Sequence, residues 1–217
     1  MKKRIAALLP LCLFLSSCDA LPYPRELEST LLVRVLGVDW QEPAAAVTAA
    51  DDPEEGEEPT LLTASDEELE KAMDKLKKAG EAYVSLTHVT QMIVGEESDL
   101  KDVLEMALEH KELGQTATVW MARGRTAQTL MEEVQGGAKR LSSIQLNGDF
   151  APPTVLEALA ALEETGEVTL PRLTAKEGTL EAVDTVIWRE DGDERGEDLR
   201  AAGGGAHRDR TAGTAGG

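Results

Sequence analysis

Short apolar runs alternate with amphipathic helical patterns along most of this chain. Branched apolar residues dominate residues 31–40, 89–94 and 116–122, and each run has a length and composition typical of a buried strand. Between these runs, apolar residues recur at helical spacing, first over about 66–79 and then from Asp99 to a stop at Gly114. The alternation predicts an α/β or α+β fold, in which helices pack on one small mixed β-sheet.

Capping residues mark where several helices should begin. Ser65 and Glu68 have the spacing of a capping box, and Ser98 or Asp99 is placed to cap the following helix. Two further helices are predicted, one from Thr126 to about Val134 and one that opens at Pro152-Pro153 and runs to about Glu164. Proline suits the first turn of a helix because that turn needs no backbone donor.

The pattern leaves alternatives open in three places. Residues 81–88 fit a strand or a short connection, and residues 139–149 fit a connection whose middle, 140–146, could be helical. The proline-rich acidic segment at about 41–60 fits a mobile loop or a poorly ordered hairpin. Its acidic residues, within 51–58, lack the regular spacing and placed glycine of a calcium-binding loop, so they indicate a solvated run of charge.

The last part of the chain changes in character. Residues 168–173 and 182–188 are short apolar segments that could pair as strands. From residue 190 to 217 the chain is rich in glycine and charge and has almost no large apolar side chain. Such a segment cannot bury enough apolar surface to offset the entropy lost on ordering, and we expect residues 190–217 to form a disordered tail.

The N-terminal segment has the form of a lipoprotein signal. A basic start precedes an apolar run over residues 5–15, which is too short for a bilayer core that needs roughly 20 apolar residues. The run ends in a processing box made of Leu15, Ser16, Ser17 and Cys18. The thiolate of Cys18 is the nucleophile that would attack the lipid donor and form a thioether. We therefore predict a signal peptide at 1–17, lipidation at Cys18 and a tether over 18–30.

Charge and cysteine content restrict the possible partners. The chain has 22 Lys and Arg residues against 41 Asp and Glu residues, and removal of residues 1–17 would leave 19 against 41, a net charge of −22. Nucleic acid and anionic lipid head groups repel such a surface, so we predict no nucleic-acid partner and membrane attachment through the lipid alone. The only cysteines are Cys12 and Cys18, which leaves no pair for a disulfide in the mature domain.

No pattern of catalytic or metal-binding residues is recognisable. The segment that follows residues 89–94 carries Glu96 and Glu97 where a phosphate loop would carry glycine amides. There is no Gly-x-Ser-x-Gly nucleophile elbow and no His/Cys pair with zinc spacing. His88 lacks an evident acidic or nucleophilic partner and is interpreted as a partly buried, hydrogen-bonded structural histidine. We predict no catalytic residue, no metal site and no cofactor.

A family resemblance appears when these segments are taken in order. After the processing box come Arg25-Glu26-Leu27, Leu36-Gly37-Val38-Asp39, His88-Val89, Ile93-Val94-Gly95-Glu96-Glu97, Asp102-Val103-Leu104 and Thr118-Val119-Trp120-Met121-Ala122-Arg123-Gly124. Over roughly residues 15–175 the chain resembles the N-terminal domain of the C subunit of spore germination nutrient receptors, a bacterial lipoprotein family. The resemblance implies a domain over 31–175 and makes residues 176–189 the start of a truncated second domain.

The resemblance also implies a function. Such a protein would be a non-catalytic subunit, lipid-anchored on the outer face of the spore inner membrane beside two membrane-embedded partner subunits, and it would take part in the response to small germinants. Cys18 is the only residue to which the resemblance assigns a chemical role. The alternative is a generic surface lipoprotein that binds a solute or assists the folding of exported proteins.

Overall fold

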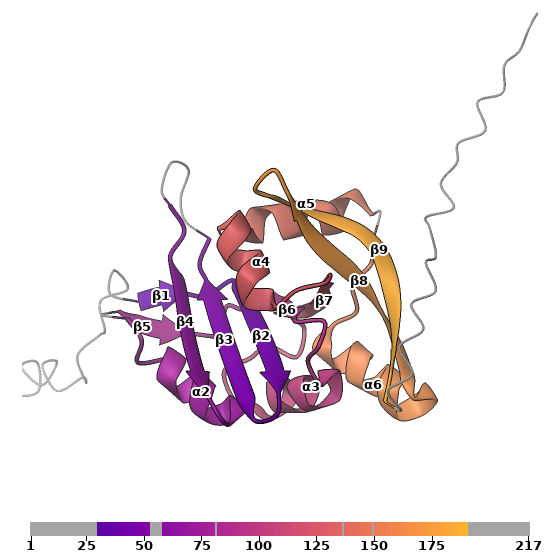
Figure 1. The fold of residues 1–217 in the computed structure, drawn as a ribbon, viewed down its shortest axis with the longest axis horizontal. Coiled ribbons are helices and arrows are strands. Elements are labelled where there is room, and N and C mark those ends of the chain that lie inside the picture. The colour runs from indigo at the N-terminus through magenta and orange to yellow at the C-terminus, as the bar shows by residue number, and fades with distance from the viewer. Residues whose placement is uncertain (1–29, 53–57, 81, 136, 149, 191–217) are drawn as a thin grey trace, which may run out of the picture.

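The computed structural model describes residues 30–52, 58–80, 82–135, 137–148 and 150–190 (Figure 1). The predicted signal peptide, most of the tether and the predicted tail from residue 191 onward lie outside these ranges, as does the middle of the acidic segment. Within the described residues the fold is mixed α/β, with a multi-stranded sheet and helices packed on it, which confirms the predicted fold class.

The strands form a seven-stranded sheet and a separate two-stranded sheet within the described residues. The large sheet has the order β4-β3-β2-β6-β7-β8-β9; β2, β6, β7 and β8 run parallel, and β3, β4 and β9 are antiparallel to their neighbours. Its strands are β2 (Val35–Gln41), β3 (Ala44–Ala50), β4 (Leu61–Asp66), β6 (Gln91–Val94), β7 (Thr118–Ala122), β8 (Glu167–Lys176) and β9 (Thr179–Arg189). The parallel pair of β1 (Thr30–Leu32) and β5 (Tyr83–Ser85) makes the small sheet.

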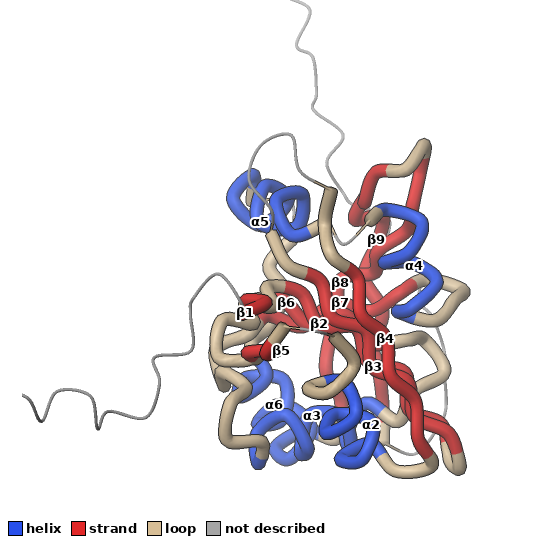
Figure 2. Tube along the Cα trace, turned by 90° about the vertical axis from the view of Figure 1, so that its left-hand side faces the viewer, coloured by secondary structure: helices blue, strands red, loops and turns tan. Residues whose placement is uncertain are grey.

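Helices cover both faces of the large sheet (Figure 2). One face packs against α2 (Leu69–Leu76), α3 (Leu100–Glu109) and α6 (Val155–Thr165), and the other against α4 (Ala127–Val134) and α5 (Ala138–Asn147). The predicted connection over residues 139–149 is therefore largely the helix α5. Because two helical layers enclose them, the central parallel strands are buried on both faces, which explains their continuous apolar sequences.

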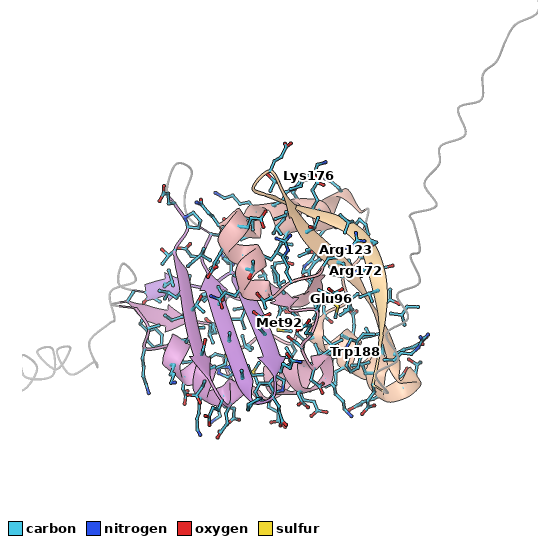
Figure 3. The ribbon with its side chains drawn as sticks, in the orientation of Figure 1. Met92, Glu96, Arg123, Arg172, Lys176 and Trp188 are labelled. Carbon is cyan, nitrogen blue, oxygen red and sulfur yellow. The ribbon has the colours of Figure 1, made fainter. Side chains whose placement is uncertain are left out.

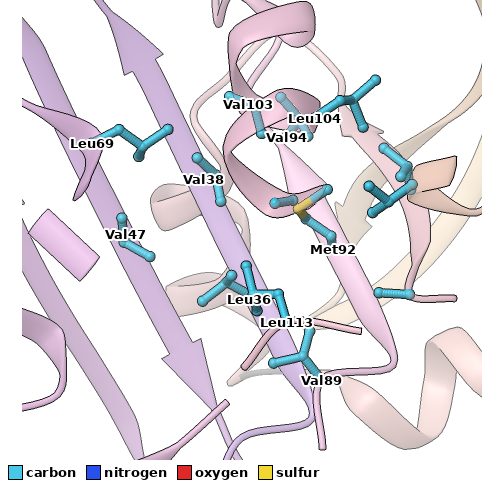
Figure 4. Packing of buried hydrophobic residues seen from close by; sticks show 14 of the residues in the cluster. Leu36, Val38, Val47, Leu69, Val89, Met92, Val94, Val103, Leu104 and Leu113 are labelled. Atoms are coloured by element: carbon cyan, nitrogen blue, oxygen red, sulfur yellow. The ribbon is translucent and has the colours of Figure 1, made fainter. Parts of the chain in front are cut away.

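Alternate side chains along each central strand enter different halves of the core. Leu36 and Val38 of β2 join Met92 of β6 in the larger cluster, beneath α2, α3 and α6 (Figure 4). Val35 and Ile93 point the other way and pack with α4 and α5. This separation follows from the two-residue period of a strand, which places consecutive side chains on opposite faces of the sheet.

The predicted helix starts at Asp99 and Thr126 are confirmed, and the two others lie later in the chain than predicted. Asp99 caps α3 by accepting hydrogen bonds from two backbone amides of the first turn. The last predicted helix begins at Val155 with a Thr154 capping box, so the two prolines precede the helix and do not form its first turn. The box predicted at Ser65 is absent, because Ser65 continues β4 and pairs with Ala46. Helix α2 consequently begins only at Leu69 and ends at Leu76, not at residue 79.

Part of the segment interpreted as a loop over residues 41–60 is a strand within the sheet. Residues 44–50 form β3, which pairs along its whole length with β2 and with β4. Alanine has a low strand propensity, which is why the sequence indicated a loop. Strand pairing on both edges and helices on both faces override this propensity, and the hydroxyls of Thr48 and Thr63 add a cross-strand hydrogen bond of 3.1 Å.

The two C-terminal apolar segments pair as expected, in one long hairpin. β8 and β9 run antiparallel from the pair Glu167 and Arg189 to the pair Lys176 and Thr179. The domain end expected at residue 175 therefore lies just before the turn of this hairpin. Residues 179–189 form the edge strand of the same sheet, so the described domain extends through β9.

Candidate functional site

A cavity of about 850 Å³ lies at the edge of the sheet where the parallel strands β2, β6 and β7 end. In α/β sheets, ligands commonly bind outside the carboxyl ends of the parallel strands, and this volume falls within the usual range of small-molecule pockets. Its lining comes from β2 and the β2–β3 turn, the start of β3, the end of β4 and the residue after it, α2, and the loops after β6 and β7. The lining residues are Asp39, Trp40, Gln41, Pro43, Ala44, Ala45, Ala46, Ser65, Asp66, Glu67, Lys75, Gly95, Glu96, Glu97, Ser98, Gly124, Arg125 and Thr126.

Asp39 joins the end of β2 to the start of α4. Its carboxylate accepts hydrogen bonds from the backbone amides of Ala127, at 2.6 Å, and Gln128, at 2.9 Å. A carboxylate at a helix N-terminus satisfies free amides and interacts favourably with the helix dipole. Burial raises the pKa of Asp39, and the two backbone hydrogen bonds act in the opposite direction. Asp39 thus fixes the helix against the sheet at the cavity wall.

Gly95 gives Asp39 the space that it occupies. A β-carbon at residue 95 would overlap Oδ1 of Asp39 and would lie 3.2 Å from Oγ of Ser98. The backbone of the loop after β6 can therefore approach the carboxylate only because residue 95 has no side chain.

Substituting Gly95 with alanine should destabilise the domain by about 1–3 kcal/mol, since the new methyl group must displace Asp39 from the start of α4. Chemical denaturation would measure the change in unfolding free energy. Gly114→Ala is the matched control, because a β-carbon there meets no atom closer than 3.7 Å. Equal stabilities of the two variants would contradict the structural role assigned to Gly95.

Charged side chains form a network beside the cavity. Glu96 accepts a hydrogen bond from the backbone amide of Gly124 and lies 3.4 Å from a guanidinium nitrogen of Arg172 (Figure 3). Arg172 makes two 2.7 Å hydrogen bonds to the carboxylate of Asp184, which raise the pKa of Arg172. Arg123 lies 3.4 Å from the same carboxylate. The network joins the loop after β6 and the end of β7 to the β8–β9 hairpin.

Trp40 forms part of the wall between this cavity and a second depression between α2 and α3. Its backbone amide donates to Oγ of Ser98 at 3.0 Å, and its indole Nε1 donates to Asp102 at 3.1 Å. The side chain is half-buried and lines both hollows. The indole hydrogen bond connects the ring to α3, and the backbone hydrogen bond connects the end of β2 to the loop after β6.

The residues for which the sequence predicted a role lie elsewhere. Leu15, Ser16, Ser17 and Cys18 are outside the described residues. His88 is exposed, so its interpretation as a partly buried histidine is wrong. The half-buried histidine is His110, whose Nδ1 accepts from the amide of Glu112 and whose pKa is lowered by burial.

The described residues offer neither a metal-binding cluster nor a membrane-spanning helix. They contain no group of three or more His, Cys, Asp or Glu side chains arranged to hold a metal ion. In the same part of the chain, no helix combines the length and the apolar character needed to cross a membrane.

The segments that carried the sequence resemblance meet at the cavity. Asp39 ends the Leu-Gly-Val-Asp segment, Gly95 and Glu96 belong to the Ile-Val-Gly-Glu-Glu segment, and Gly124 ends the segment that begins at Thr118. Residues 24–175 match the family described as the spore germination protein N-terminal domain. The chain belongs to this spore germination family. The match confirms the resemblance to the C subunit of germinant receptors that the sequence indicated.

Comparison with solved structures found a similar protein. The crystal structure of the GerBC protein is similar at 16% sequence identity, with a TM-score of 0.39. The similarity covers 76% of this chain and 51% of that one, so the chain spans about half the length of GerBC. The comparison with curated proteins gave no match.

Proposed function

We propose that this protein is a non-catalytic, lipid-anchored subunit of a spore germinant receptor, held at the outer face of the spore inner membrane and assembled with two membrane-embedded partners. The observation that carries the proposal is the family match, which begins at residue 24, shortly after the processing box that ends in Cys18. Because only a few residues separate Cys18 from the start of the match at residue 24, this tether would keep the folded domain close to the lipid surface. The family and the anchor signal thus point to the same location.

The polar side chains around the cavity support a non-catalytic role. The carboxylate of Asp39 is used by two amides of α4, and Glu96 and Arg172 bond to each other and to neighbouring groups. A general acid or base must have access to the proton that it transfers, within hydrogen-bond reach of a substrate. These groups instead connect elements of the fold.

The cavity itself favours a second candidate function, solute binding by a surface lipoprotein. Its volume of about 850 Å³ is sufficient for a small polar molecule, and its lining combines an apolar wall with a few charged groups. A solute-binding lipoprotein differs from a receptor subunit because it requires no membrane-embedded partner.

Affinity purification separates the two functions. The full chain, tagged at its C-terminus, would be purified from detergent-solubilised spore membranes, and the co-purifying proteins identified by mass spectrometry. We expect two multi-span membrane proteins in amounts comparable to the tagged chain and absent when an unrelated tagged lipoprotein is purified. Recovery of the tagged chain without any membrane protein above that control would reject the receptor assembly.

A further inference from the structure

The second depression is a groove of about 690 Å³ bounded by α2, α3 and the β2–β3 turn. Four apolar residues and seven carboxylate residues line it, and none of the lining residues carries a positive charge. We call it the acidic groove: Trp40, Glu42, Pro43, Glu67, Glu68, Leu69, Glu70, Asp102, Glu105, Met106 and Glu109. It lies outside the cavity at the strand ends and shares with it only Trp40, Pro43 and Glu67.

The apolar part of the acidic groove packs against the core and is accessible. Trp40 and Met106 are half-buried, so each packs against the core with one side and leaves the other side open. The hydrogen bond from Trp40 to Asp102 connects the indole to α3. Packing against the core restricts both side chains, so they have less conformational freedom to lose on binding.

The carboxylates around this surface are poorly compensated within the domain. Asp102, Glu105 and Glu109 follow one face of α3 at helical spacing, and like charges at i and i+4 destabilise a helix. Within the described part of the chain, Glu42, Glu70, Glu105 and Glu109 form no ion pair, whereas Lys71 and Lys75 of α2 pair with Glu68 and Asp66. The groove therefore presents an apolar surface surrounded by negative charge that a cationic partner would neutralise.

We propose that the acidic groove binds a segment of a partner protein that combines lysine or arginine with apolar side chains. The apolar side chains would pack on Trp40 and Met106, and the cationic groups would contact the carboxylates and the indole face. Anionic head groups and nucleic acid are repelled by the same charges. The inference deepens the proposed function, on which it rests for the existence of a partner, by identifying the surface and the chemistry of the contact.

The test compares two variants with the same change in net charge. Glu70→Gln, Glu105→Gln and Glu109→Gln together remove three of the seven carboxylates of the acidic groove without removing a described ion pair, and all three side chains are exposed. Glu132→Gln, Glu163→Gln and Glu164→Gln together make the same change at exposed positions of α4 and α6 outside the groove. The full chain in non-ionic detergent would be titrated with a fluorescent peptide of alternating lysine and alanine with a central leucine, and with its glutamate counterpart.

We expect saturable binding of the lysine peptide, about tenfold weaker for the groove variant and within about twofold of wild type for the control variant. The glutamate peptide should not bind. Equal losses of affinity in the two variants would show that only net charge matters and would overturn the proposal. Absence of saturable binding, or equal binding of the glutamate peptide, would overturn it as well. A wild-type chain that binds the peptide but never co-purifies with membrane proteins would reject the receptor assembly and leave the groove assignment standing.

Discussion

Replacing Cys18 with alanine should abolish acylation and release the protein from the membrane fraction. A lipidated cysteine carries two acyl chains, and each buried methylene contributes about 0.8 kcal/mol, so that two chains give stable anchoring where one does not. The mature chain would have a net charge of −22, so electrostatic attraction to anionic lipid cannot replace the acyl chains. Palmitate labelling of cells, followed by fractionation and immunoblotting, would measure both effects.

Cys12 supplies the matched control for this experiment. It lies within the predicted signal peptide, so Cys12→Ala should leave labelling and membrane association unchanged. The label also distinguishes an acyl anchor from an uncut apolar signal, because only the former incorporates palmitate. Persistent labelling of Cys18→Ala would refute the assignment of the lipidation site.

Substituting Arg172 with methionine should destabilise the domain by about 3 kcal/mol. Asp184 is only 8% exposed, and the substitution removes its two 2.7 Å hydrogen bonds from the guanidinium. Removing one partner of a buried ion pair costs about 3–5 kcal/mol because the other charge stays buried. Arg123 remains at 3.4 Å from Asp184, which places the expected loss at the lower end of this range.

Two further variants make the measurement specific. Arg172→Met combined with Asp184→Leu removes both charges and should recover much of the lost stability, since hydrophobic replacements of buried pairs are often neutral. Arg189→Met breaks a more exposed pair with Glu167 and should cost at most about 1 kcal/mol. Equal unfolding free energies for Arg172→Met and Arg189→Met, measured by chemical denaturation, would show that burial of Asp184 does not govern the effect.

Local patterns in the sequence were sufficient to predict the central strands of the sheet and the start of α3. Strands β2, β6 and β7 are buried on both faces and therefore have continuous apolar sequences, and α3 begins at the cap predicted at Asp99. Strand β3 was missed because its alanines carry no strand signal of their own. Its conformation depends on pairing with β2 and β4, and such contacts cannot be recognised within a short window of sequence.

The cavity could not be predicted, because its geometry depends on contacts between distant parts of the chain. Asp39 is separated from Ala127 by 88 residues, and Glu96 from Arg172 by 76 residues. The sequence did offer a signal, since Gly95 with Glu96 and Arg123 with Gly124 directly follow apolar runs. Parallel strands bring such positions to one edge, but the sequence alone did not establish that these strands are neighbours.

The bonds from Asp39 to the start of α4 have a consequence for how the domain folds. The first amides of α4 donate to Asp39, which lies on a strand 88 residues earlier in the chain. These hydrogen bonds can form only after the intervening chain has folded so that β2 and α4 lie together. Contacts of such long sequence separation slow folding and favour all-or-none behaviour. Excision of the segment that contains α4 and α5 as an isolated peptide would deprive α4 of this acceptor, so the helicity of the peptide in solution should fall well below that in the intact domain.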